Sequence, residues 1–104
     1  MPITEMEFIL SPLTDHSQVT DLIETVCRDL ELTCSLKDTL KSYPDCVHWH
    51  YRNEKFTGTL EITWFASKPR LWAKIHRKRQ AAWITTTLPL IKQRIEEYRK
   101  EQKS

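Results

Sequence analysis

Apolar residues in the first third of the chain predict a short strand followed by an amphipathic helix. The segment Glu7–Leu10 is mostly apolar and is followed closely by Pro12, which cannot donate a hydrogen bond to a strand ladder. Apolar residues then recur every three or four positions, as along one face of a helix: Val19, Leu22, Ile23, Val26, Cys27 and Leu30. Asp15, with Gln18 three residues later, has the capping-box pattern. We therefore predict a strand at Glu7–Leu10 and a scaffold helix that begins after Asp15.

Strict alternation of apolar and polar residues predicts three strands in the middle of the chain. Cys46–Arg52, Thr59–Phe65 and the stretch from Leu71 to His76 place apolar residues at every second position, as a strand with one buried face does. The apolar sides consist of Val47, Trp49 and Tyr51, of Leu60, Ile62 and Trp64, and of Leu71, Ala73 and Ile75. With turns at residues 53–58 and 66–69, the three strands form an antiparallel meander.

The segment between the first helix and the meander fits two patterns. Leu32, Cys34 and Leu36 alternate like a strand, whereas Leu36 and Leu40 are spaced like one helical turn. Residues 43–45, Tyr-Pro-Asp, then predict a turn. The sequence is compatible with either an additional strand or a helical turn before it.

The period changes again after Arg79 and predicts a second helix. Apolar residues fall on one side of it, namely Ile84, Leu88, Ile91, Ile95 and Tyr98. Pro89 lacks the N–H group that a helix interior needs, but a proline is tolerated in a first turn. We therefore predict an N-cap at Thr86 or Thr87, after a turn or a kinked extension at residues 83–84.

Together these elements predict an α+β fold of the order β-α-(β)-β-β-β-α, with both helices packed on one face of an antiparallel sheet. At 104 residues, 39% of them hydrophobic and 29% charged, the chain fits one domain spanning residues 1–104. No element remains to cover the other face, which is therefore a candidate binding surface. We expect it to display Cys46, His48, His50, Glu61, Thr63, Phe65, Trp72, Lys74 and His76.

The sequence also predicts the compartment. Glu5 and Glu7 stand where a secretory signal has basic residues, and no apolar run approaches the roughly 20 residues of a bilayer-spanning helix. The three cysteines include no CxxC pair, which favours reduced thiols over a disulfide framework. We expect a cytoplasmic or nuclear protein with no membrane partner.

The glycine content excludes several enzyme classes. Gly58 is the single glycine and lies in a predicted hairpin, so the chain has neither a phosphate-binding P-loop nor a GxGxxG dinucleotide fingerprint. A GxSxG nucleophile elbow is absent for the same reason. No residue pattern indicates an oxyanion hole, and we therefore expect a binding protein with no catalytic residue and no cofactor.

The predicted open face carries side chains that could bind a metal ion. Cys46, His48 and His50 lie on one side of a strand, and Glu61 or His76 could add a ligand from across the sheet. Thiol, imidazole and carboxylate groups suit Zn²⁺. Neighbours on one face of a strand are about 7 Å apart, however, and the paired spacings of structural zinc sites are missing. The sequence alone favours solvated or hydrogen-bonded histidines and predicts no metal site.

Charge is distributed unevenly along the chain. Residues 1–61 carry a net charge of −6 and residues 62–104 one of +8, with no Asp or Glu between Ile62 and Ile95. Such asymmetry points to an anionic partner, unless the two halves interleave in space and neutralise each other. Residues 68–79, here called the basic segment, hold six cations with Trp72 and His76 among them: Lys68, Arg70, Lys74, Arg77, Lys78 and Arg79.

Cations attract phosphates and flat aromatic rings stack on unpaired bases, so the basic segment predicts nucleic-acid binding. A solvated basic edge strand is the alternative interpretation. The order of helix, three strands and helix between Val19 and Lys100 is similar to that of double-stranded RNA-binding domains, which also place basic residues around the start of the second helix. The matching residues here run from Arg77 to Ala81. The predicted strand at Glu7–Leu10 and the long Leu32–Asp45 connection depart from that pattern.

A second hypothesis is a regulatory or adaptor module that binds protein. Phe65 and Trp72 on the open face would then form the interface with a protein partner, or the seam of a homodimer.

Overall fold

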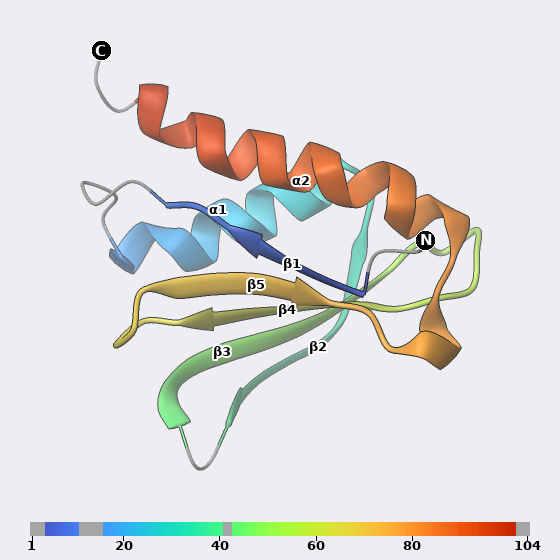
Figure 1. Ribbon diagram of the computed structural model, residues 1–104, viewed down its shortest axis with the longest axis horizontal. Coiled ribbons are helices and arrows are strands. Elements are labelled where there is room, and N and C mark those ends of the chain that lie inside the picture. The colour runs from blue at the N-terminus through green and yellow to red at the C-terminus, as the bar shows by residue number, and fades with distance from the viewer. Residues whose placement is uncertain (1–3, 11–15, 41–42, 102–104) are drawn as a thin grey trace.

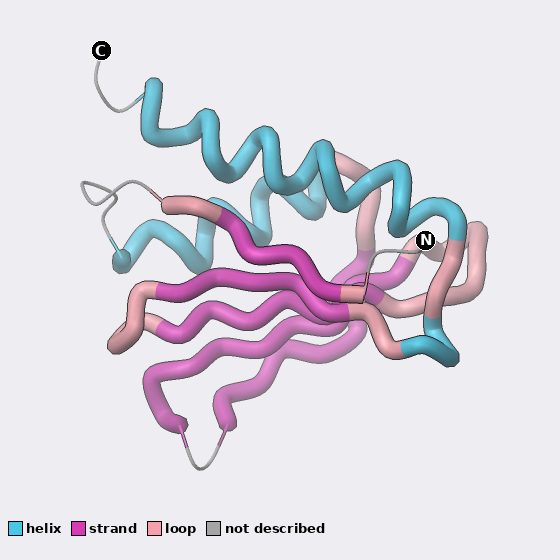
Figure 2. Tube along the Cα trace, viewed as in Figure 1, coloured by secondary structure: helices cyan, strands magenta, loops and turns pink. Residues whose placement is uncertain are grey.

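The computed structural model describes residues 4–10, 16–40 and 43–101, which form one five-stranded antiparallel sheet and two α-helices (Figure 1). Along the chain the elements are β1 (Glu5–Phe8), α1 (His16–Asp29), β2 (Thr33–Leu40), β3 (Tyr43–Arg52), β4 (Leu60–Phe65), β5 (Arg70–Lys74), the short 3-10 helix η1 (Arg77–Arg79) and α2 (Ala82–Glu101). The strands lie in the order β1-β5-β4-β3-β2, each antiparallel to its neighbours (Figure 2). The predicted α+β fold is confirmed.

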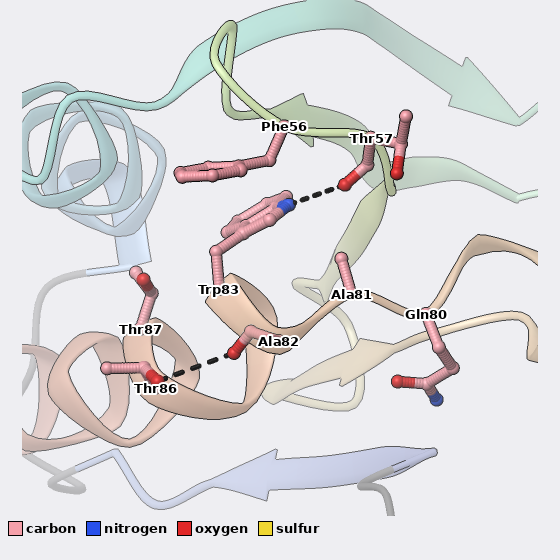
Figure 3. A pocket seen from close by; sticks show the side chains of 8 residues that line it. All are labelled: Phe56, Thr57, Gln80, Ala81, Ala82, Trp83, Thr86 and Thr87. Atoms are coloured by element: carbon pink, nitrogen blue, oxygen red, sulfur yellow. Dashed lines mark hydrogen bonds between the residues drawn. The ribbon is translucent and has the colours of Figure 1, made fainter.

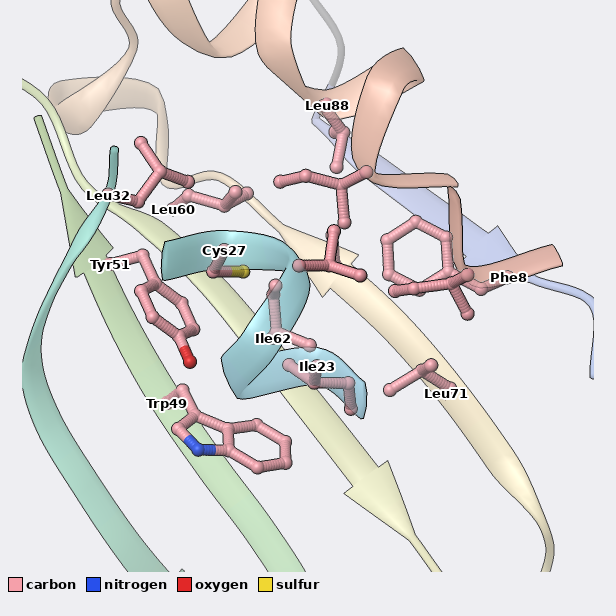
Figure 4. Close-up of a cluster of buried hydrophobic side chains, with 14 of the residues drawn as sticks. Phe8, Ile23, Cys27, Leu32, Trp49, Tyr51, Leu60, Ile62, Leu71 and Leu88 are labelled. Atoms are coloured by element: carbon pink, nitrogen blue, oxygen red, sulfur yellow. The ribbon is translucent and has the colours of Figure 1, made fainter. Parts of the chain in front are cut away.

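Both α-helices lie on the same side of the sheet, and the hydrophobic core fills the space between the two layers (Figure 1, Figure 4). The sheet contributes the alternating residues of the meander together with Phe8, and the helices contribute Val19, Ile23, Val26, Cys27, Ile84, Leu88, Ile91 and Ile95. Burying one such large side chain stabilises the fold by about 1.5–3 kcal/mol. No helix among the described residues is long and apolar enough to cross a bilayer.

The first strand begins and ends two residues earlier than its apolar run suggested. Met6 pairs with Ala73 and Phe8 with Leu71 in the ladder between β1 and β5. After Phe8 the chain leaves this ladder, because the backbone N–H of Ile9 donates instead to the Glu96 carboxylate on α2 at 2.7 Å. The end of β1 is therefore set by a contact with α2.

Most of the ambiguous segment is strand. β2 pairs with β3 and forms one edge of the sheet, with irregularities in register between Cys34 and Leu36 and between Thr39 and Leu40. The predicted turn at residues 43–45 is wrong, because β3 already begins at Tyr43 and pairs there with Leu40.

The second helix begins at Ala82, so the predicted N-cap at Thr86 or Thr87 is wrong. Its first turn is fixed by Trp83, which is buried and whose indole N–H donates to the carbonyl oxygen of Thr57 at 2.8 Å. Pro89 lies inside the helix and leaves the carbonyl group of residue 85 without its helical donor. Residue 85 is exposed, and water can satisfy that carbonyl group.

The connection between β3 and β4 meets the start of α2 where Thr57 accepts the Trp83 indole hydrogen bond (Figure 3). Gly58, the next residue, lies against Ala81 and Arg79. Its φ of 110° is open to glycine and costly for other residues. Next to it, the Thr59 N–H donates to the carbonyl oxygen of Arg79 at 3.1 Å. This junction holds the end of η1 against the start of β4, and therefore positions the basic residues of η1.

The buried Trp49 is satisfied from the helical layer. Its indole N–H donates to Oε2 of Glu24 on α1 at 3.0 Å, and the same oxygen pairs with Nζ of Lys37 on β2 at 2.6 Å. Burial raises the pKa of Glu24, but the hydrogen bonds from Lys37 and Trp49 outweigh it and hold the pKa below its ordinary value. Glu24 therefore connects α1 to the neighbouring strands β3 and β2.

Candidate functional site

The sheet face that points away from the helices, here called the open face, carries the polar side of the meander. Cross-strand register places three rows side by side on it: His50, Glu61 and Lys74; His48, Thr63 and Trp72; and Cys46, Phe65 and Arg70. No described helix packs on this face, since α1 and α2 both lie on the other side (Figure 1). The meander thus has the polar face, with no described helix packed on it, that its alternation predicted.

Three residues expected to be displayed on the open face are nevertheless buried. Cys46, Glu61 and Thr63 are 2%, 8% and 6% exposed. Their side chains lie on the two central strands between larger neighbours, and His48 and Trp72 flank Thr63 on either side. Adjacent side chains therefore cover part of this face, and Phe65 and Trp72 are themselves only partly exposed.

Histidines from β3 and from the end of β5 converge on the carboxylate of Glu61. Oε1 of Glu61 lies 3.2 Å from Nε2 of His48 and 3.7 Å from Nε2 of His50, while Oε2 lies 2.9 Å from Nε2 of His76. The two Nε2 atoms of His48 and His50 are 3.1 Å apart. We call His48, His50, Glu61 and His76 the His–Glu cluster. Three of the four histidines of the chain thus share one buried carboxylate.

The electrostatic setting of His50 lowers its pKa. Burial lowers the pKa of His50; the nearby Glu61 acts against this, whereas His48, Arg79 and His76 act with it, and the net direction is below the ordinary value. A neutral imidazole has one nitrogen lone pair, and at His50 this pair can accept a proton donor or bind a cation.

The basic segment is divided between two ends of β5. At one end Lys68 lies in the turn after β4, and Arg70 pairs with Glu7 of β1, Nη2 to Oε1 at 2.7 Å. The Arg70 guanidinium also lies over the ring of Trp72, 5.2 Å from its centroid. Interleaving of the acidic and basic halves therefore does neutralise this end, as the alternative interpretation of the charge pattern required.

At the other end the cations remain available to a ligand. Arg77, Lys78 and Arg79 form η1, are all exposed, and take part in no ion pair within the described part of the chain. Together with His50, Glu61 and His76 they line a surface hollow of about 540 Å³. Lys74, also exposed, pairs in register with Glu61 on the open face. The structure thus brings Lys74, His76 and η1 together beside the His–Glu cluster.

Sequence reasoning missed the most exposed apolar side chains. These are Ile9, Leu36, Phe56 and Leu90, and they do not include Phe65 or Trp72. Phe56 and Trp83 line a second hollow, of about 470 Å³, at the Gly58 junction (Figure 3). The one sequence signal for Phe56 is that it is an aromatic residue within the otherwise polar connection 53–58.

Comparison with protein-family models, with curated proteins and with solved structures gives no match for this chain. In the described part of the structure four strands separate the two α-helices and β1 precedes α1, so the element order departs from the helix, three strands and helix of double-stranded RNA-binding domains.

Proposed function

We propose that the protein is a nucleic-acid-binding domain whose contact surface is the basic end of the open face. The observation that carries this proposal is η1, where Arg77, Lys78 and Arg79 stand exposed beside a hollow without an acidic partner among the described residues. Phosphate contacts by such cations release condensed counterions, which supplies most of the affinity for a polyanion.

The geometry of η1 suits contacts to more than one phosphate. A 3-10 helix has about three residues per turn, so three consecutive side chains point in three directions around its axis. The Gly58 junction and the hydrogen bond from Thr59 to the Arg79 carbonyl hold this turn in place. His76, directly before η1, adds an exposed ring that can stack on an unpaired base.

Trp72 and Arg70 have a smaller part in this proposal than the sequence suggested. The Arg70 guanidinium covers Trp72 and is already paired with Glu7. The contact surface therefore consists of Lys74, His76 and η1, and Lys68 and Arg70 lie at the opposite end of β5.

Fluorescence anisotropy with short labelled single- and double-stranded DNA and RNA tests the proposal at several salt concentrations. Each lost phosphate contact reduces the slope of log K against log salt by about 0.9 for duplex DNA and about 0.7 for single strands. We expect Lys78→Ala to reduce the slope by about that amount, and the triple replacement of η1 by alanine to reduce it by about 2–3.

Arg94→Ala is the matched control, because Arg94 is an exposed cation on α2, in the layer on the other side of the sheet. It removes the same charge and should leave the slope unchanged. Equal effects of Lys78→Ala and Arg94→Ala would mean diffuse attraction without a site. Absence of binding at low salt would refute the proposal and favour the protein-interaction hypothesis for the open face.

A further inference from the structure

We infer that His48, His50 and Glu61 form a binding site for a divalent transition-metal ion, with Zn²⁺ the best-suited ion. The three side chains each offer one donor atom, and these atoms all lie within 4.8 Å of one another. Two imidazoles and one carboxylate suit zinc and its neighbours in the first transition row better than calcium or magnesium.

The spacing of the donor atoms matches a tetrahedral ion. Metal–ligand bonds of about 2.0–2.1 Å at tetrahedral angles place neighbouring ligand atoms about 3.3 Å apart. The observed separations are 3.1 Å between the two histidine Nε2 atoms, 3.2 Å from His48 Nε2 to Glu61 Oε1, and 3.7 Å from His50 Nε2 to the same oxygen. An ion can therefore be bound at equal distance from the three donors with only small side-chain adjustments.

Two further residues hold the ligands in the required orientation. Nδ1 of His48 lies 2.8 Å from Oγ1 of Thr63, which is buried on β4. With a metal on Nε2, the Nδ1–H group donates to this hydroxyl oxygen, and this hydrogen bond fixes the tautomer and the ring plane. Nε2 of His76 lies 2.9 Å from Oε2 of Glu61 and holds the carboxylate with Oε1 toward the histidines. Thr63 and His76 are positioning residues.

Burial gives this arrangement a reason to bind a cation. The side chain of Glu61 is 10% exposed, and those of His48 and His50 are 20% and 23% exposed. A buried carboxylate needs compensation for the lost hydration, which hydrogen bonds from imidazoles supply only in part. A divalent ion would satisfy the carboxylate and two imidazole nitrogens at once. The hollow that His50, Glu61, His76 and η1 line adjoins this site.

Zinc titration of untagged, chelator-treated protein in competition with a chromophoric chelator tests the site. We expect one zinc per chain, and cobalt(II) in its place should give the intense visible absorption of a tetrahedral ion. Glu61→Gln and His50→Gln keep side-chain size and polarity, and should abolish stoichiometric binding. His16→Gln replaces the remaining histidine, at the start of α1, and should leave the affinity unchanged.

The positioning residues give a graded result that a merely structural role would not produce. Thr63→Val keeps the shape but removes the hydroxyl oxygen, and should weaken zinc binding by about 10–100-fold, whereas Thr63→Ser should restore it. His76→Gln should weaken binding within the same range. Thermal unfolding of each variant without metal shows whether the fold is retained.

Two outcomes of these experiments would contradict the inference. Wild-type protein that binds less than one zinc per chain at micromolar concentration would overturn it, as would unchanged affinity in Glu61→Gln and His50→Gln. Should these variants fail to fold, imidazole NMR signals of the wild type decide: zinc must shift those of His48 and His50 and leave that of His16 in place. The metal site shares His76 and one hollow with the proposed nucleic-acid contact, but the two tests are separate. Failure of zinc binding leaves the salt dependence of η1 as a separate measurement.

Discussion

Replacing Gly58 by alanine tests how closely the β3–β4 connection packs against the start of α2 (Figure 3). The new methyl group would lie 2.7 Å from Cβ of Ala81 and 3.0 Å from the carbonyl oxygen of Arg79. Cβ atoms do not approach each other this closely, so the backbone must shift. The residue must also adopt a φ of 110°, which side chains other than glycine strongly disfavour.

The two penalties have separate magnitudes. Holding a residue with a side chain at such a φ costs about 1–3 kcal/mol, and forcing an extra methyl group into a packed site costs about 1–3 kcal/mol. We therefore expect Gly58→Ala to reduce the free energy of unfolding by roughly 2–6 kcal/mol, out of the roughly 5–15 kcal/mol typical of a domain. For a chain of this size, each kcal/mol corresponds to roughly 4–8 °C in Tm.

Urea unfolding followed by tryptophan fluorescence measures the loss, and Ala81→Gly separates its two parts. The double variant removes the Ala81 methyl group that the new Cβ meets but leaves φ and the Arg79 carbonyl contact unchanged, so it should recover only the part of the loss due to Ala81. Destabilisation by Gly58→Ala of less than about 0.5 kcal/mol, the range of ordinary surface substitutions, would refute this description of the junction. Additive effects of the two substitutions would place the cost in the backbone conformation and the Arg79 contact.

Three further predictions concern the scaffold. Pro89→Ala restores a helical hydrogen bond in the exposed middle of α2 and should raise the free energy of unfolding by about 1–3 kcal/mol in urea titrations; a loss of stability would show that the proline is needed there. Glu24→Ala leaves the buried indole N–H of Trp49 without its acceptor and should cost about 1–3 kcal/mol at pH 7. The pKa of Glu24 is below its ordinary value of 4.5, so the stability that the Glu24 carboxylate contributes is complete above pH 4.5 and is lost as the pH falls through the lowered pKa. The stability difference between Glu24→Ala and wild type should therefore shrink on acidification. A constant difference between pH 7 and pH 3 would contradict this. In the folded protein Ellman's reagent should modify the exposed Cys34 but not Cys27, because burial raises the pKa of Cys27 to about 12; mass spectrometry showing equal labelling would contradict the packing of α1.

The sequence pattern predicted those parts of the fold in which each residue is either clearly buried or clearly exposed. The meander and α1 have one buried face each, and their apolar residues alternate or recur accordingly. β2 lacks this signal because it is an edge strand, whose residues from Thr33 to Thr39 are all exposed. The predicted beginning of α2 was wrong because it rested on the preference of proline for the first turn of a helix. The sequence does not show the hydrogen bond from Trp83 to Thr57, which stabilises the helical turn N-terminal to Pro89.

For the candidate site, the sequence predicts only which side chains lie on the same face of a strand. Alternation places His48 and His50 on one face, and the register then pairs His50 with Glu61 and His48 with Thr63 on β4. The spacing of about 7 Å measures from backbone to backbone and does not give the distance between the ring nitrogens, whose two Nε2 atoms are 3.1 Å apart. Side-chain conformation decides this, and no periodicity in the sequence encodes it.

The pairing of β1 with β5 has a consequence for how the protein is made. Glu7 and Arg70, which face each other at this seam, are 63 residues apart in sequence. A ribosome synthesises β1 first, yet its partner strand emerges only after the rest of the sheet. Closing so long a loop is entropically unfavourable, and folds with many such contacts reach the native state slowly. We therefore expect β2 to β5 to assemble before β1 docks. Until β1 pairs, the outer edge of β5 is an open strand edge, the kind of surface at which unfinished chains associate with one another.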